Sequence, residues 1–101
     1  MSKRSDDQIR ADCEILRDDP GKFVDLMNRR IQEDPKDSSS YFSRHQGWLR
    51  LGREAKARDD FDTEMKLKCK AIEDLDAAIA LKSNPVHNLS RGKILASLGR
   101  H

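Results

Sequence analysis

Apolar residues recur along the chain every three or four positions, which is the spacing that places side chains on one face of an α-helix. Polar and proline-containing segments divide this pattern into five stretches. We predict helices over about 6–17, 20–33, 38–52, 53–82 and 85–98, with no strand between them. The stripes that support them are Ile9, Cys13 and Leu16; Phe23, Leu26, Met27 and Ile31; Tyr41, His45, Trp48 and Leu51; Phe61, Met65, Cys69, Ile72, Leu75 and Ile79; and Leu89, Leu95 and Leu98.

Capping residues mark where several of these helices begin. Ser5 and Gln8 have the spacing of a capping box, in which a hydroxyl and a side-chain amide satisfy backbone N–H groups. Asp19 precedes Pro20, which is the pattern of an N-cap followed by proline in the first turn. The serine run 38–40 offers a hydroxyl cap for the third helix.

Glycines are expected to end two of the helices. Gly52 and Gly99 each follow an apolar stripe, where a left-handed glycine often closes a helix. No helix breaker lies between positions 53 and 82, so we expect a fourth helix of about 25 residues or more.

Composition supports a folded helical protein and indicates the cellular compartment in which it is expected. Charged residues make up 38% of the 101 positions, but the regular apolar spacing indicates amphipathic helices instead of disorder. The 20 basic and 18 acidic residues are interspersed, so no strong field of one sign is expected. No apolar run approaches the roughly 18 residues of a membrane span, and the first residues lack a signal-peptide pattern. We therefore expect a cytoplasmic protein whose Cys13 and Cys69 are buried free thiols and not a disulfide.

The chain contains an internal repeat. Residues 43–53 align without a gap on residues 90–100, and both segments begin with Ser-Arg and end with Leu-Gly-Arg. Each segment follows a proline, Pro35 or Pro85, that comes after a predicted helix. The repeated unit is therefore a helix, a Leu-Gly-Arg turn, a second helix and a proline turn.

This unit resembles the tetratricopeptide repeat family. The residues that carry the resemblance are Trp48 with Leu51-Gly52-Arg53, Arg91-Gly92 with Leu98-Gly99-Arg100, and the run 71–81 with Asn84-Pro85. The resemblance implies an all-α fold of antiparallel helix pairs stacked as a short α-solenoid. In such a stack small residues such as Gly92, Ala71 and Ala78 let helices approach closely. An ordinary up-and-down bundle is the alternative that periodicity leaves open.

The resemblance also implies how one domain, 1–101, is organised. Residues 5–35 would form a degenerate first helix pair or a cap, residues 38–82 a central repeat, and residues 84–101 a half repeat or C-terminal cap. Relative to the family spacing, the segment 57–70 supplies about 14 extra residues. Since 14 residues are close to four helical turns, we expect a lengthened fourth helix that overhangs its neighbours.

By the same resemblance, the chain is a non-catalytic protein–protein interaction module. The first helix of each pair would line a groove that binds a peptide or protein partner. The implied lining residues are Phe42, Gln46, Leu49, Arg50, Leu89, Lys93, Ala96 and Ser97. These side chains could instead be ordinary exposed surface. The last helix would serve as a terminal cap or, alternatively, would leave an apolar face open, which invites partner docking or a homodimer.

No constellation of residues indicates an enzyme. His45, His87 and His101 are far apart in sequence and lack metal-ligand spacing, and His45 falls on an apolar stripe where packing is expected. Neither cysteine belongs to a CxxC pattern or lies beside a histidine. We therefore expect no catalytic residue, no metal and no cofactor.

Two other functions stay open at this point. A short helical-repeat protein could be a dedicated bacterial immunity protein, or a secretion or effector chaperone, that neutralises one partner. A nucleic-acid-binding helical protein is the other alternative, which the interspersed charges and the 5% of aromatic residues argue against.

Overall fold

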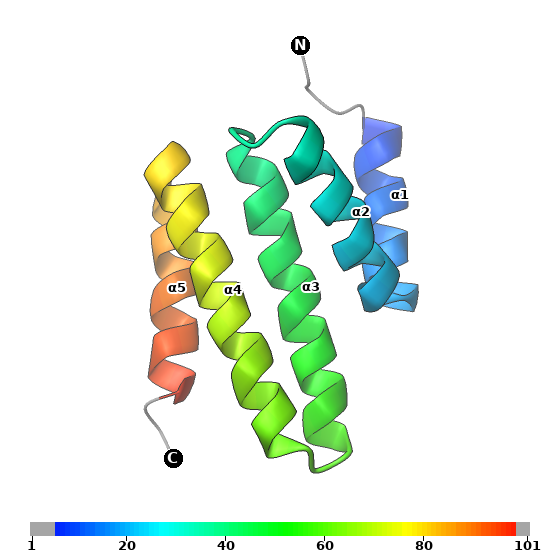
Figure 1. The fold of residues 1–101 in the computed structure, drawn as a ribbon, viewed down its shortest axis with the longest axis vertical. Helices are drawn as coiled ribbons and strands as arrows, with labels where there is room; N and C mark the ends of the chain where they lie inside the picture. The colour runs from blue at the N-terminus through cyan, green and yellow to red at the C-terminus, as the bar shows by residue number, and fades with distance from the viewer. Residues whose placement is uncertain (1–5, 99–101) are drawn as a thin grey trace.

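The structure, a computed structural model, describes residues 6–98 and is built in that range from five α-helices (Figure 1). They are α1 (Asp6–Asp18), α2 (Pro20–Glu33), α3 (Ser38–Ala57), α4 (Phe61–Leu81) and α5 (Pro85–Leu98). The prediction of an all-helical chain is confirmed for this range. The expected cap at Ser5 and the expected helix end at Gly99 lie outside the described residues.

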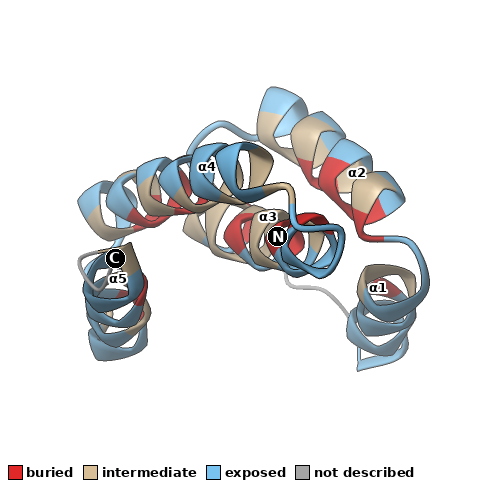
Figure 2. Ribbon diagram, turned by 90° about the horizontal axis from the view of Figure 1, so that it is seen from below, coloured by how far each residue is buried: buried red, intermediate tan, exposed pale blue. Residues whose placement is uncertain are grey.

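The helices form an arch around a central antiparallel pair. α3 and α4 run side by side along their whole lengths, with α2 packed on α3, α5 packed on α4, and α1 against α2 and α3 (Figure 1). In the end-on view of Figure 2, α1 and α5 lie at opposite ends of the molecule but on the same side of it, with α3 between them. This leaves one face of α3 bordered by a helix on each side.

Aspartates cap the second and third helices. The side chain of Asp19 accepts a hydrogen bond from the backbone N–H of Lys22 at 3.1 Å, so the predicted start of α2 is confirmed. α3 is capped by Asp37 and not by the serine run that follows it. Asp37 accepts from the backbone N–H of Ser39 and from the hydroxyls of Ser39 and Ser40, at 2.8–3.2 Å. A carboxylate can accept all three bonds, whereas a serine cap would satisfy one backbone donor.

Gly52 does not end a helix, and the predicted boundary between residues 52 and 53 is wrong. α3 continues five residues further, to Ala57, and α4 begins at Phe61. No described glycine has a positive φ, so Gly52 does not form the left-handed turn expected of it. Instead it faces α4, where an added Cβ would lie 3.8 Å from Leu67 Cβ. Gly52 therefore lies where α3 and α4 approach closely, and it does not reverse the chain.

The reversal between α3 and α4 is made by two aspartates. Asp59 has a φ of 61°, the left-handed conformation that Asp adopts more readily than most residues. Asp60 then caps α4 by accepting a hydrogen bond from Thr63 N–H at 3.2 Å. The extra residues of the segment 57–70 therefore fall on both sides of this turn, and α3 accompanies α4 (Figure 1). The predicted overhang of the fourth helix alone is wrong.

The core is small and follows the predicted stripe of α4 only in the second half of that helix, where Leu75 is buried and Ile72 packs against the core. Phe61 is 60% exposed and Met65 and Cys69 are exposed, whereas Ala71 and Leu75 are fully buried. α4 turns its small residues and Leu75 inward because Ala can approach a neighbouring helix closely. The buried apolar residues are Phe23, Val24, Met27, Ala55, Ala71, Leu75, Ala78 and Ile94.

Both cysteines are free and exposed, so the prediction of buried thiols is wrong. Cys13 lies on α1, whose apolar face is covered only in part by α2 and α3. Cys69 lies on the outward face of α4 described above. In both cases the apolar stripe was read correctly as helical, but the neighbouring helix does not cover that position.

Glycines on α3 and α5 play unequal roles. A Cβ on Gly47 would lie 2.6 Å from Val24 Cγ2, so α2 and α3 can cross at this distance only without a side chain there. Gly92 was expected to permit a similar approach, but a Cβ there would meet no atom within 4 Å. The expectation for Gly92 is wrong because that side of α5 faces solvent.

Candidate functional site

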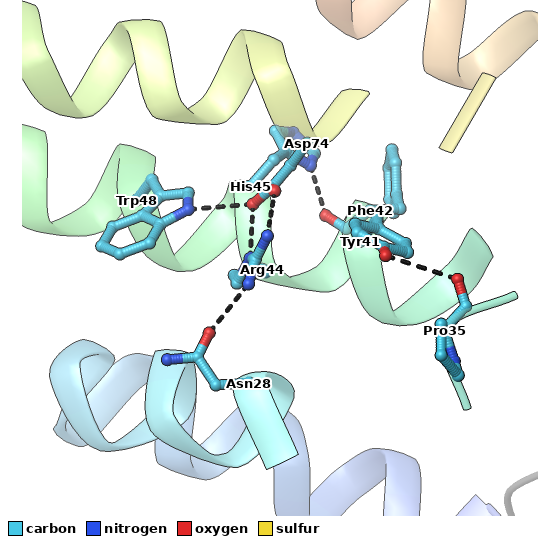
Figure 3. Close-up of polar contacts among 8 residues, drawn as sticks. All are labelled: Asn28, Pro35, Tyr41, Phe42, Arg44, His45, Trp48 and Asp74. Carbon is cyan, nitrogen blue, oxygen red and sulfur yellow. Dashed lines mark hydrogen bonds and ion pairs between the residues drawn. The ribbon is translucent and has the colours of Figure 1, made fainter. Parts of the chain in front are cut away.

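A buried ion pair joins the two central helices. Asp74 of α4 accepts hydrogen bonds from Arg44 Nε at 2.9 Å and Arg44 Nη2 at 2.6 Å, and from the indole N–H of Trp48 at 2.9 Å (Figure 3). Arg44 also donates from Nη1 to Asn28 of α2 at 2.9 Å. The hydrogen bond and charge of Asp74 raise the pKa of Arg44 above its ordinary value. Three helices are thus held by one polar network.

This network is structural and leaves little capacity for acid–base chemistry. Asp74 is 4% exposed, and both of its carboxylate oxygens accept from fixed donors. Trp48, expected as an apolar core residue, is half-buried and uses its N–H in the network. Burial of such a carboxylate is tolerated because its charge is paired and its hydrogen bonds are satisfied.

A cluster of three rings connects α3 with α5. The ring centroid of Phe42 lies 4.7 Å from that of His45 and 4.5 Å from that of His87. Both histidines are buried, His45 as expected from its place on the stripe. His45 donates from Nδ1 to the Phe42 carbonyl oxygen, whereas His87 Nδ1 is buried without a hydrogen-bond partner. Loss of solvation lowers the pKa of both histidines.

Three adjoining hollows follow one face of α3, and we call them together the α3 groove. The first hollow, of about 790 Å³, lies between α1 and the start of α3 and has Ile9, Leu16 and Phe42 among its lining residues. The second hollow, of about 380 Å³, lies between α3, α4 and α5. The third hollow, of about 260 Å³, connects them, since it shares Gln46 with the first and Leu49 with the second.

Six of the eight predicted partner-binding residues line this groove. Phe42 and Gln46 line the first hollow, Arg50 lines the third, and the second is lined by residues that include Leu49, Lys93 and Ser97. The residues chosen from the sequence thus include side chains of α3 and α5 that lie on the same concave side of the structure.

Leu89 and Ala96, the remaining two predicted residues, line none of these three hollows. Both are exposed on α5, and Leu89, with 61% of its surface exposed, lies near Val86, which is 56% exposed. This is the open apolar face for which self-association was expected, and a homodimer through it stays a prediction.

Sequence reasoning missed several lining residues of the second hollow. Arg53 and Lys56 of α3 line it, as do Lys68 of α4 and Ile94 of α5. Positions 46, 49, 53 and 56 are spaced by three, four and three, so they share one helical face. Continuing α3 beyond residue 52 would have placed Arg53 and Lys56 on the same face as the predicted residues.

The described part of the chain contains neither a metal-binding cluster nor a membrane-crossing helix. No group of three or more His, Cys, Asp or Glu side chains within residues 6–98 could hold a metal ion. None of the helices in that range combines the length and the apolar character needed to cross a bilayer.

In comparisons with known proteins, no protein family, curated protein or solved structure matches the chain.

Proposed function

We propose that this chain is a non-catalytic interaction module that binds a peptide or protein segment along the α3 groove. The observation that carries the proposal is the continuity of the three hollows along one face of α3. Together they offer apolar side chains such as Leu16 and Leu49 beside polar ones such as Gln46. Protein-recognition surfaces combine apolar anchors with polar contacts in this way.

The internal repeat supports a tetratricopeptide-like stacking of the helices. Arg44 and Arg91 occupy equivalent positions of the two similar segments. Each donates to a residue of the helix that precedes its own, Arg44 to Asn28 at 2.9 Å and Arg91 to Asp76 at 2.5 Å. The two segments therefore engage their preceding helices through the same position, as repeated units would.

The exposed thiols fit a reducing compartment such as the cytoplasm. Cys13 and Cys69 lie on different helices and both are free. Exposed thiols of this kind persist where glutathione and thioredoxin keep cysteines reduced.

The proposal is tested by selecting random peptides on the folded protein and measuring the affinity of the enriched sequences. Gln46 is exposed and lies where the first and third hollows meet, so Gln46→Trp should obstruct the groove without removing a core contact. We expect the variant to weaken the selected peptides by about tenfold or more.

Gln32→Trp is the matched control, because Gln32 is also exposed but lies on α2, beside a different hollow. It should leave the affinity unchanged. Absence of any enriched peptide, or equal weakening by both variants, would contradict the proposed function.

A further inference from the structure

The second hollow of the α3 groove is strongly cationic. We propose that it receives an acidic segment of the bound partner protein, an inference that rests on the proposed function and specifies the chemistry of the ligand. Four cationic side chains and a single carboxylate line this hollow, namely Arg53, Lys56, Lys68, Lys93 and Glu64.

Most of this positive charge is not neutralised within the chain. Lys68 is paired with Glu64 at 3.3 Å and donates to Ser97 at 2.8 Å. Arg53, Lys56 and Lys93 are exposed and form no ion pair with any residue in the range 6–98. Three cations gathered around one concavity repel one another, and an anion bound among them removes that repulsion.

The tertiary structure brings together basic residues that are dispersed along the sequence. The whole chain carries a formal net charge of only +2, with 20 basic and 18 acidic residues. The second hollow alone has an excess of three cations over its one carboxylate. This local excess contrasts with the interspersed charges of the sequence, from which no strong field of one sign is expected. Arg50, exposed in the adjoining third hollow, extends the cationic surface along α3.

Aliphatic side chains contribute to the lining of the hollow. Leu49 of α3 and Ile94 of α5 line it, and Ile94 is only 6% exposed. A volume of about 380 Å³ accommodates a few side chains. The best occupant is therefore a segment that presents carboxylates to the rim and aliphatic side chains to Leu49 and Ile94.

The same observations favour a protein over a nucleic acid. Single-stranded nucleic acids bind through aromatic side chains on which bases stack. None of the described residues that line the second hollow is Phe, Tyr or Trp. His45 is the one ring among the described lining residues. It is only 3% exposed and its centroid lies 4.7 Å from that of Phe42, so it offers almost no surface on which a base could stack, and Trp48 lies with Lys70 beside another hollow. The described lining of the hollow therefore presents its cations without an exposed aromatic surface for base stacking.

The test measures the binding of labelled probes by fluorescence anisotropy. The first probe is an octapeptide of alternating leucine and glutamate, and the second replaces each glutamate by glutamine. A short single-stranded oligonucleotide of mixed sequence is the third. We expect the glutamate peptide to bind about tenfold or more tightly than the glutamine peptide, and to weaken as NaCl rises from about 50 mM to about 500 mM.

Charge reversal locates the binding. Arg53→Glu/Lys93→Glu should weaken the glutamate peptide by about tenfold or more. The control Arg29→Glu/Lys66→Glu makes the same change in net charge at exposed positions outside the second hollow and should leave the affinity within about twofold. Equal weakening by the two double variants would overturn the proposal, because the attraction would then be diffuse.

Two further outcomes would also overturn it. If the oligonucleotide binds more tightly than the glutamate peptide and is released by Arg53→Glu/Lys93→Glu, the hollow is a nucleic-acid site. If the peptides selected in the display experiment depend on Gln46 but contain no acidic residues and tolerate Arg53→Glu/Lys93→Glu, the acidic preference fails while the proposed protein-binding function stands.

Discussion

Arg44 of α3 holds Asp74 of α4 by two hydrogen bonds, Nε to Oδ2 at 2.9 Å and Nη2 to Oδ1 at 2.6 Å, and Asp74 is almost completely buried. These residues are 30 positions apart in sequence. The pair fixes the rotation of α4, because no other face of that helix would bring Asp74 to Arg44 and Trp48.

Removing the negative charge of this pair should strongly destabilise the protein. Asp74→Asn leaves Arg44 without its ion-pair partner, and we expect a loss of about 3 kcal/mol in the free energy of unfolding, measured with urea. Asp76→Asn is the control, since Asp76 forms an ion pair with Arg91 in which both side chains are about half exposed. That change should cost less than about 1 kcal/mol. Equal losses would show that burial does not set the strength of the Arg44 pair.

Alanine at two glycines of the repeat should have opposite effects. Gly47→Ala places a Cβ 2.6 Å from Val24 Cγ2, so α2 must move away from α3, and we expect a loss of about 1–3 kcal/mol. Gly92→Ala adds a methyl group in open space on α5, where alanine is the better helix former, and should stabilise by about 0.5–1 kcal/mol. Thermal unfolding followed by circular dichroism compares them. A destabilised Gly92→Ala would mean that α5 packs differently.

Stability should fall as the pH drops below the ordinary pKa of histidine. Burial lowers the pKa of His45 and His87 in the folded protein, so the unfolded chain takes up protons first. The stability contributed by the neutral rings is fully present above about pH 6.5 and is lost as the pH falls from there toward the folded-state pKa values.

Urea unfolding at about pH 7.5 and about pH 5.5 measures this dependence. His87→Phe keeps an aromatic ring beside Phe42 but cannot be protonated, so it should show a smaller loss between the two pH values. An unchanged pH dependence in the variant would indicate that other groups are responsible.

Glycine should be favourable at the turn between α3 and α4. Asp59 has a φ of 61°, a conformation that strains most side chains, and its neighbour Asp60 already supplies the helix cap. We expect Asp59→Gly to stabilise the protein by about 0.5–1 kcal/mol, since removal of the strain exceeds the entropy that glycine loses on folding. Asp60→Gly, which removes the cap, should give the opposite sign in the same urea titration. Destabilisation by Asp59→Gly would show that its side chain stabilises the turn.

The start of α2 was predicted reliably because its physical cause is local. Asp19 and Pro20 predicted the start of α2 because a capping carboxylate and a fixed proline φ act within one turn. Gly52 misled the prediction because a glycine serves a helix end and a close helix crossing equally well, and only the presence of Leu67 of α4 distinguishes them.

The candidate site was predicted in part for the same reason. Gln46, Leu49 and Arg50 line the groove because they share one face of the predicted third helix. Arg53 and Lys56 were missed because the predicted third helix ended at residue 52, five residues short of its real end at Ala57.

The amino-acid sequence by itself determined that the chain is helical, where prolines and aspartates interrupt the helices, and which side chains of α3 could share a face. These properties depend on backbone conformation and on neighbours within one or two turns. The tertiary structure alone decided which face of α4 is buried and how cations from α3, α4 and α5 come to surround one hollow. That outcome depends on helix rotation, which is set by close glycine crossings and by a buried ion pair between residues distant in the chain.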